Sequence, residues 1–341
     1  MKIIGIETSC DESAAAVIEN GKVIHSNVIA SQAEIHAQYG GIVPEIASRQ
    51  HMISIIPVFQ QALEDANMKA SELDGIAVTY GPGLAGSLLI GVNAAKGLAL
   101  ANELPFIGIN HLEGHIYASW LEDMNPEQAI GFPLMCLIAS GGHTDLILME
   151  GHDHYTLVGR TRDDAAGEAF DKAARVLSLG FPGGPAIQRA SESSIGGEAR
   201  FPRPNIKDSL DFSFSGLKSA VVRRAQEKNM YPPPEDVDLD AQEVANVAAA
   251  FQEAMVDSMV IRTLAAAKLH NVKGILLGGG VASNSLLRSE MKRRAPVEVI
   301  VPEPALCTDN GAMIGAAAFY HLRHGNHFQW DMDVIPNLRL G

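Results

Sequence analysis

Two histidines, His111 and His115, stand four residues apart in a segment that we expect to be helical. Residues at i and i+4 share one face of an α-helix, so the two imidazoles could hold a single metal ion. The same spacing also occurs where histidines cap a helix or pack in a core. The pair alone is therefore a candidate metal site with an ordinary structural alternative.

A third metal donor is expected from an internal repeat. His111 opens the helix after the last strand of one half of the chain, and Asp309 stands at the start of the matching helix in the other half. If a pseudo-twofold axis relates the halves, these helix starts meet at a cleft and a bound ion bridges the two halves. Two histidines and one carboxylate form a facial triad with open positions, a pattern suited to Fe(II) or to Zn(II).

The acidic residue between the histidines disfavours a metallopeptidase. In that class the general base directly follows the first histidine, as in H-E-x-x-H. Here Glu113 comes two residues after His111, about 200° round the helix, so its carboxylate is poorly aimed at a metal-bound water. Peptidase chemistry remains only as an alternative.

Glycine-rich segments are candidates for binding a nucleotide. Residues 140–142 (Ser-Gly-Gly) follow an expected strand, and such loops let backbone N–H groups approach an anion, although tight turns also use glycine for steric reasons. Residues 278–280 are three glycines before an expected helix, whose N-terminus favours phosphate. Asp171 either caps a helix or faces ribose hydroxyls. Neither a Walker A motif nor G-x-G-x-x-G in the Rossmann context occurs, which disfavours a P-loop NTPase and a dinucleotide dehydrogenase.

The elements that must position these residues form two related halves. Residues 2–29 predict three strands in a meander with an Asn20-Gly21 turn, and residues 75–121 predict the order β-α-β-α. The same two patterns return over residues 134–158 and 273–323. The repeat predicts an α/β protein of two domains with mixed sheets flanked by helices.

We place the two domains at residues 1–130 and 131–341, with the active site in the cleft between them. A helical insertion is expected within the second domain, at about residues 160–240, where two Pro-Gly-rich breaks occur.

Composition and charge narrow the class of protein further. Apolar residues make up 47% and charged residues 19% of the 341, as in globular proteins. The net charge of -14 excludes a general attraction to nucleic acid, so an RNA ligand would need local basic clusters. Such clusters include Arg200, Arg203, Lys218, Arg223, Arg224, Arg288, Lys292, Arg293 and Arg294. Three widely spaced cysteines and the absence of a signal-peptide pattern predict a reducing, cytoplasmic location without a membrane span.

Ten blocks of sequence, in order, resemble one family closely along nearly the whole chain: the bacterial tRNA N6-adenosine threonylcarbamoyltransferases of the actin-like (ASKHA) superfamily, formerly labelled O-sialoglycoprotein endopeptidases. The blocks are residues 5–12, 36–45, 81–84, 111–115, 140–144, 164–172, 181–185, 212–218, 278–284 and 308–311.

The resemblance implies two actin-like domains and a specific reaction. The threonylcarbamoyl group would pass from threonylcarbamoyl-AMP to the N6 amine of the tRNA adenosine just 3′ of the anticodon. The implied cofactor is one divalent metal ion per chain, Fe(II) or alternatively Zn(II). Besides tRNA and threonylcarbamoyl-AMP, the implied partners are a smaller actin-like paralogue and a small ATPase.

Carried over by position, the resemblance also implies roles for particular residues. The implied metal ligands are His111, His115 and Asp309, and the implied catalytic loop contains Asp11 and Glu12. The implied contacts to the nucleotide and acyl group come from Ile138, Ala139, Ser140, Gly141, Gly142, Asp171, Gly184 and Asn284. Gln188 departs from the family, in which many members have an acid.

Two further alternatives accompany the peptidase. An actin-like small-molecule kinase would share the expected fold, but such kinases need no histidine pair. A non-catalytic scaffold paralogue would lack the two histidines and Asp309. Since all three residues are present, we expect the catalytic member of the complex.

Overall fold

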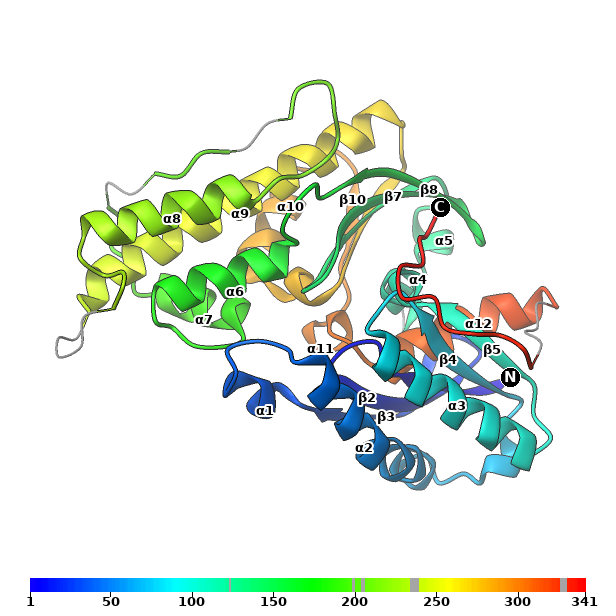
Figure 1. Ribbon diagram of the computed structural model, residues 1–341. Coiled ribbons are helices and arrows are strands. Elements are labelled where there is room, and N and C mark those ends of the chain that lie inside the picture. The colour runs from blue at the N-terminus through cyan, green and yellow to red at the C-terminus, as the bar shows by residue number, and fades with distance from the viewer. Residues whose placement is uncertain (123, 198–199, 204–205, 234–238, 326–329) are drawn as a thin grey trace. The chain divides into compact units, whose positions relative to one another are not determined.

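The described residues form two compact units, each containing a five-stranded sheet (Figure 1). The first unit comprises Met1–Gly131, Gly151–Tyr155 and Pro302–Gly341, and the second comprises Phe132–Glu150 and Thr156–Val301. This computed structural model describes residues 1–122, 124–197, 200–203, 206–233, 239–325 and 330–341.

The first sheet has the strand order β3-β2-β1-β4-β5. Its strands are β1 (Lys2–Glu7), β2 (Glu12–Glu19), β3 (Val23–Ser31), β4 (Gly75–Gly81) and β5 (Phe106–Asn110). β2 runs antiparallel to both of its neighbours, β1 and β3, whereas β4 and β5 continue the sheet parallel to β1. This is the predicted meander followed by β-α-β.

Helices α2 (Pro44–Asp65) and α3 (Ala85–Ala101) cover one face of the first sheet (Figure 1). Alternate strand residues, including Ile4 and Ile6, point into the core that these helices close. On the opposite face α12 (Gly311–Arg323) packs against β1 and β2. A Cβ on Gly5 would lie 2.2 Å from the Gly311 carbonyl oxygen, so only glycine lets the start of α12 come this close to β1.

Short helices complete the first unit. They are α1 (Ala33–Ala37), η1 (Ala70–Glu72), α4 (His111–Tyr117), η2 (Ala118–Trp120), α5 (Pro126–Ala129) and α11 (Pro304–Cys307). The helix that we expected to start at Asp309 begins two residues later, at Gly311, because α11 and a bend precede it.

The second sheet repeats the first, with the order β10-β9-β6-β7-β8. Its strands are β6 (Leu134–Ala139), β7 (Thr144–Gly151), β8 (His154–Arg160), β9 (Gly274–Gly278) and β10 (Glu298–Ile300). The meander β6 to β8 takes the place of β1 to β3, and β9 and β10 take the places of β4 and β5. The predicted repeat and two-sheet α/β fold are confirmed.

Helices of the second unit include those of the expected insertion. They are α6 (Ala166–Val176), α7 (Gly183–Ser191), α8 (Ser215–Glu227), α9 (Ala241–Leu269), η3 (Gly280–Ser283) and α10 (Ser285–Arg294). The first three fall within residues 160–240, of which 198–199, 204–205 and 234–238 lie outside the described part. The domain division at residue 130 stays a prediction; the contacts of α12 group residues 302–341 with the first unit.

Helix α9 is, among the described residues, long and apolar enough to cross a membrane. However, 67% of its most apolar window is buried, and α9 packs against α7, α10 and β6. Such burial is what a core helix of a globular unit shows.

Candidate functional site

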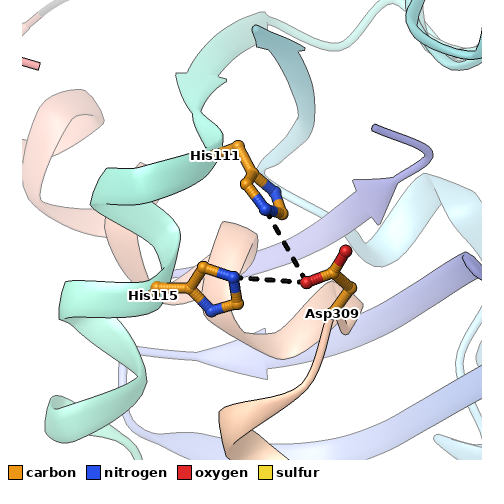
Figure 2. Close-up of side chains that lie close together, drawn as sticks. All are labelled: His111, His115 and Asp309. Atoms are coloured by element: carbon orange, nitrogen blue, oxygen red, sulfur yellow. Dashed lines mark ion pairs between the residues drawn. The ribbon is translucent and has the colours of Figure 1, made fainter. Parts of the chain in front are cut away.

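The two candidate histidines lie on one face of α4, which begins directly after β5. The Asn110 side chain caps this helix by accepting a hydrogen bond from the backbone N–H of Leu112 at 2.9 Å. The cap fixes the first turn, so the i, i+4 spacing brings the rings of His111 and His115 together with centroids 4.6 Å apart (Figure 2). Both side chains are buried.

Asp309 reaches the same place from the segment between α11 and α12. Its Oδ1 atom lies 3.2 Å from Nε2 of His115 and 3.7 Å from Nε2 of His111 (Figure 2). All three residues belong to the first compact unit, because α12 packs on β1 and β2 despite its late position in the chain. In the two compact units the three donors come from within one unit, and the expectation that an ion here would bridge the domains divided at residue 130 stays a prediction.

The donor group fits a metal ion. One donor atom from each of the three residues can be chosen such that all lie within 4.8 Å of one another. Both ring nitrogens of His115 are buried: Nε2 pairs with Asp309 at 3.2 Å, and Nδ1 has no hydrogen-bond or ion-pair partner among the described residues. A buried polar atom without a partner is costly, and a metal ion would supply one. Two imidazoles and one carboxylate suit Fe(II) or Zn(II).

Behind His111 lies a fully buried carboxylate, that of Glu7 at the end of β1. The Glu7 Oε2 atom is 3.1 Å from Nδ1 of His111 and accepts a hydrogen bond from Thr79 Oγ1 at 2.6 Å. The backbone N–H of Ser9 donates to Oε1 of the same carboxylate. Nδ1 of His111 thus faces Glu7, and Nε2 faces Asp309.

The charges of this group favour a cation. Burial lowers the pKa of His111, but the nearby carboxylates of Asp309 and Glu7 outweigh this and raise it to about 9. Burial raises the pKa of Glu7, yet the adjacent His111 brings the net pKa below its usual value. For His115 burial dominates and lowers the pKa. Two carboxylates therefore need one compensating positive charge, which a proton on His111 or a metal ion can provide.

Of the predicted catalytic pair, Asp11 ends the loop that joins β1 to β2, and Glu12 is the first residue of β2. Burial raises the pKa of Glu12 to about 10, and the charges of Asp309 and Asp11 add to this effect. Ser31 Oγ donates a hydrogen bond to Glu12 at 3.3 Å. The structure therefore brings this loop into the electrostatic field of Asp309, within the first unit.

The two glycine loops of the second unit touch each other. Gly279 has a φ of +84°, and a Cβ there would lie 2.4 Å from the carbonyl oxygen of Ala139. The N–H of Gly167, at the start of α6, donates to the Ser140 carbonyl at 3.0 Å. By contrast, a Cβ on Gly141 or on Gly142 would meet no atom within 4 Å. Gly167 and Gly279 have no room for a side chain, whereas the backbone of Gly141 and Gly142 has open space above it.

The remaining predicted contacts also lie in the second unit. Asp171 Oδ1 accepts a hydrogen bond from the Gly183 N–H at 2.7 Å, which ties α6 to the start of α7. Asn284 caps α10 and donates to Gln252 Oε1 at 2.8 Å. Gln188 accepts from the backbone N–H at the start of α10 at 3.0 Å, beside this cap. A Cβ on Gly184 would meet open space.

Comparison with known proteins decides the family. Residues 23–316 match the sequence model of the family described as tRNA N6-adenosine threonylcarbamoyltransferase. The chain belongs to this family. It is 52% identical to the enzyme of that name from Dehalococcoides mccartyi over 340 residues, covering 99% of each chain. The enzyme of that name from Thermomicrobium roseum is 51% identical over 356 residues, covering 100% of this chain and 97% of the relative.

Solved structures show the fold that the family shares with other proteins. The chain resembles HypF of T. kodakarensis with a TM-score of 0.62 and 13% identity, covering 95% of this chain and 48% of HypF. This similarity confirms the expected actin-like fold and carries no further information about activity.

Within this family fold, Glu113 does not face the metal donors. Its carboxylate accepts a hydrogen bond from Tyr155 at 2.8 Å and pairs with Nε2 of His321 at 2.9 Å. Nδ1 of His321 pairs in turn with Asp153 at 3.1 Å. Glu113, Asp153 and His321 line a cavity of about 580 Å³. As expected from its position on the helix, the Glu113 carboxylate is not aimed at the metal donors, and a metallopeptidase is not supported.

Several arginines of the expected RNA-binding clusters make ion pairs with acids. Arg203 pairs with Glu253 at 2.8 Å, and Arg224 pairs with Glu243 at 2.9 Å. Arg293 pairs with Glu290 at 2.6 Å. These pairs offset the local positive charge. A basic surface that binds RNA stays a prediction for this chain.

Sequence reasoning missed residues that hold the site in place. Glu7 orients toward His111, and His51 of α2 bonds Ser13 Oγ at 2.7 Å and the Cys10 carbonyl at 3.0 Å, on either side of Asp11 and Glu12. The available signal was the acidic residue that ends strand Lys2–Glu7 directly after the uncharged run Ile-Ile-Gly-Ile.

Proposed function

We propose that this chain transfers the threonylcarbamoyl group from threonylcarbamoyl-AMP to the N6 amine of the tRNA adenosine 3′ of the anticodon, with one metal ion held by His111, His115 and Asp309. The family assignment supports the transferase activity on tRNA. The observation that supports the metal centre is the group of two buried histidines and the half-buried Asp309, in which Nδ1 of His115 lacks a partner among the described residues.

The reaction forms a bond from N6 to the carbamoyl carbon and breaks the bond from that carbon to the phosphate oxygen of AMP. The amine loses one proton, and AMP leaves. An exocyclic adenine amine is a weak nucleophile, so positioning and stabilisation of developing negative charge supply most of the rate. When bound, the metal ion supplies a Lewis acid that binds and orients donor oxygens of the substrate.

Proton transfer is assigned to the Asp11–Glu12 loop. Near Asp309 and Asp11, Glu12 holds its own proton at neutral pH as long as no cation compensates the carboxylates. Positive charge at the donor group lowers the pKa of Glu12 and makes its carboxylate available to accept the proton from N6. We therefore keep Asp11 and Glu12 as the catalytic pair.

The AMP part of the substrate is assigned to the second unit. Ile138 and Ala139 end β6, and the open space above Gly141, Gly142 and Gly184 allows a ligand to approach the backbone closely. Ser140, Asp171 and Asn284 complete this proposed nucleotide and acyl-group site.

Fe(II) is our proposed metal, with Zn(II) as the alternative that the same donors accept. The proposed macromolecular partners are tRNA, a smaller actin-like paralogue and a small ATPase, and the proposed location is the cytoplasm.

A reconstituted reaction tests this function. The purified chain is incubated with tRNA, threonine, bicarbonate, ATP and the partner proteins, and the modified nucleoside is measured by mass spectrometry. We expect threonylcarbamoyladenosine with the metal-loaded chain and at least a tenfold loss after chelation, restored by Fe(II) or Zn(II). A chain that forms no modified nucleoside under any metal condition would contradict the proposal.

A further inference from the structure

We infer that Glu7 is a positioning residue for the metal centre: its carboxylate fixes the ring of His111 so that Nε2 is the donor atom presented to the ion. This inference rests on the proposed metal site and adds a residue outside the three donors. It starts from the short distance between Glu7 Oε2 and His111 Nδ1, 3.1 Å, in a fully buried setting.

The hydrogen-bond pattern determines the tautomer of His111. An ionised carboxylate only accepts hydrogen bonds, so Nδ1 must carry the proton in the contact with Glu7. The neutral ring then has its lone pair on Nε2, which is the nitrogen that faces Asp309. Ser9 Oγ, at 3.1 Å from the same Nδ1, can accept from it as well. Neither contact engages Nε2.

Glu7 is itself held in place from two other directions. Thr79 on β4 donates to Oε2, and the N–H of Ser9 donates to Oε1. These donors satisfy a carboxylate that is fully buried, and they leave it little freedom to turn away from His111. A carboxylate that bonds the far nitrogen of a histidine ligand raises the basicity of the ligand and fixes its ring, and its loss typically weakens metal binding by about 10- to 100-fold.

A purely structural role for Glu7 is the alternative, and Glu113 offers a matched control. Glu113 is also a buried carboxylate, is also bonded to a histidine, and lies on α4 beside His111. Its partners, Tyr155 and His321, lie outside the proposed donor group of His111, His115 and Asp309. If a buried acid matters here only for packing and folding, Glu7→Gln and Glu113→Gln should affect metal binding alike.

The experiment measures Zn²⁺ affinity by chelator competition and the visible absorption spectrum of the Co²⁺-loaded protein. For Glu7→Gln we expect Zn²⁺ affinity about 10- to 100-fold below wild type and altered Co²⁺ bands. For Glu113→Gln we expect both readouts within twofold of wild type. Affinity and spectrum unchanged in a folded Glu7→Gln protein would overturn the inference. If the wild-type chain itself binds neither Zn²⁺ nor Co²⁺, the proposed metal centre fails instead.

A second measurement needs no variant at position 7. In the Zn²⁺-loaded wild-type protein labelled with ¹⁵N-histidine, His111 is assigned by comparison with His111→Gln. We expect a protonated Nδ1 and a metal-bound Nε2. The opposite assignment, with Nε2 protonated and Nδ1 on zinc, would overturn the inference even if Glu7→Gln fails to fold.

Discussion

Two clusters of imidazole and carboxylate groups share helix α4 and differ in how their ring nitrogens are paired. In the first, Nε2 of His115 pairs with Asp309 at 3.2 Å, whereas its buried Nδ1 has neither a hydrogen-bond nor an ion-pair partner among the described residues. In the second, both nitrogens of His321 are paired, with Glu113 and with Asp153.

This difference separates a ligand site from a structural link. In the second cluster His321 pairs with two carboxylates, and it joins α12 to α4 and to the turn between β7 and β8. An ion would have to displace its proton and break existing pairs. In the first cluster an ion adds contacts that the folded chain lacks. A similar residue composition thus supports two different roles.

The largest expected effect is on metal binding. Asp309→Ala removes one of three donors, so we expect Zn²⁺ affinity to fall by at least about 100-fold, or about 3 kcal/mol. Asp153→Ala, in the second cluster, is the matched control and should keep wild-type affinity. Isothermal titration of both proteins measures the difference. Equal losses in the two variants would remove the distinction between the clusters.

The next effect is on stability. His321→Ala leaves the buried Glu113 carboxylate without its ion-pair partner, and we expect the free energy of unfolding to fall by about 2 kcal/mol. Urea denaturation of the metal-free protein measures this loss. Zn²⁺ affinity should stay within twofold of wild type, and a parallel fall in affinity would show that the second cluster contributes to the metal site.

The same pair predicts a pH dependence. Burial lowers the pKa of His321, but the hydrogen bond and charge of Glu113 and the charge of Asp153 outweigh it and raise the net pKa above 6.5. His324 also pairs with Asp153 at 3.3 Å. A group whose pKa is higher in the folded than in the unfolded chain makes its full contribution to stability at a pH below the unfolded-state pKa. This contribution is lost as the pH rises through the folded-state pKa.

The stability difference between wild type and His321→Ala should therefore shrink as the pH rises from 6 toward 9. Urea denaturation at a series of pH values tests this for the metal-free proteins. A difference that grows with pH would mean that His321 is neutral in the folded chain.

The smallest effect is expected for Tyr155→Phe. This change removes the hydroxyl that donates to Glu113 at 2.8 Å while the carboxylate keeps its pair with His321. We expect a loss of about 1 kcal/mol in the free energy of unfolding and no change in Zn²⁺ affinity. Denaturation and titration together test it, and a loss of metal binding would contradict the separation of the clusters.

The sequence predicted the elements well where local signals were clear. β6 begins at Leu134, the first residue of the segment predicted to repeat the meander, and α10 follows the three glycines of residues 278–280 with Asn284 as its cap, as expected from the sequence. The β-α order and its repeat indicated the two sheets.

Long-range contacts could not be predicted in the same way. The pair of Glu7 and His111 spans 104 residues and depends on the exact register of β1 against β4 and β5. The placement of Asp309 depends on the packing of α12 against the first sheet. The repeat in the sequence did not predict this packing, because it assigned α12 to the second half. Only spatial packing shows which histidine keeps a nitrogen available for a ligand.

Anomalous diffraction from crystals grown with Zn²⁺ tests the central claim most directly. The account predicts one strong peak at the zinc edge, about 2.0–2.2 Å from Nε2 of His111, a ring nitrogen of His115 and an oxygen of Asp309. A peak at Glu113 and His321 instead, or no peak near His111 and His115 in zinc-loaded protein, would contradict it.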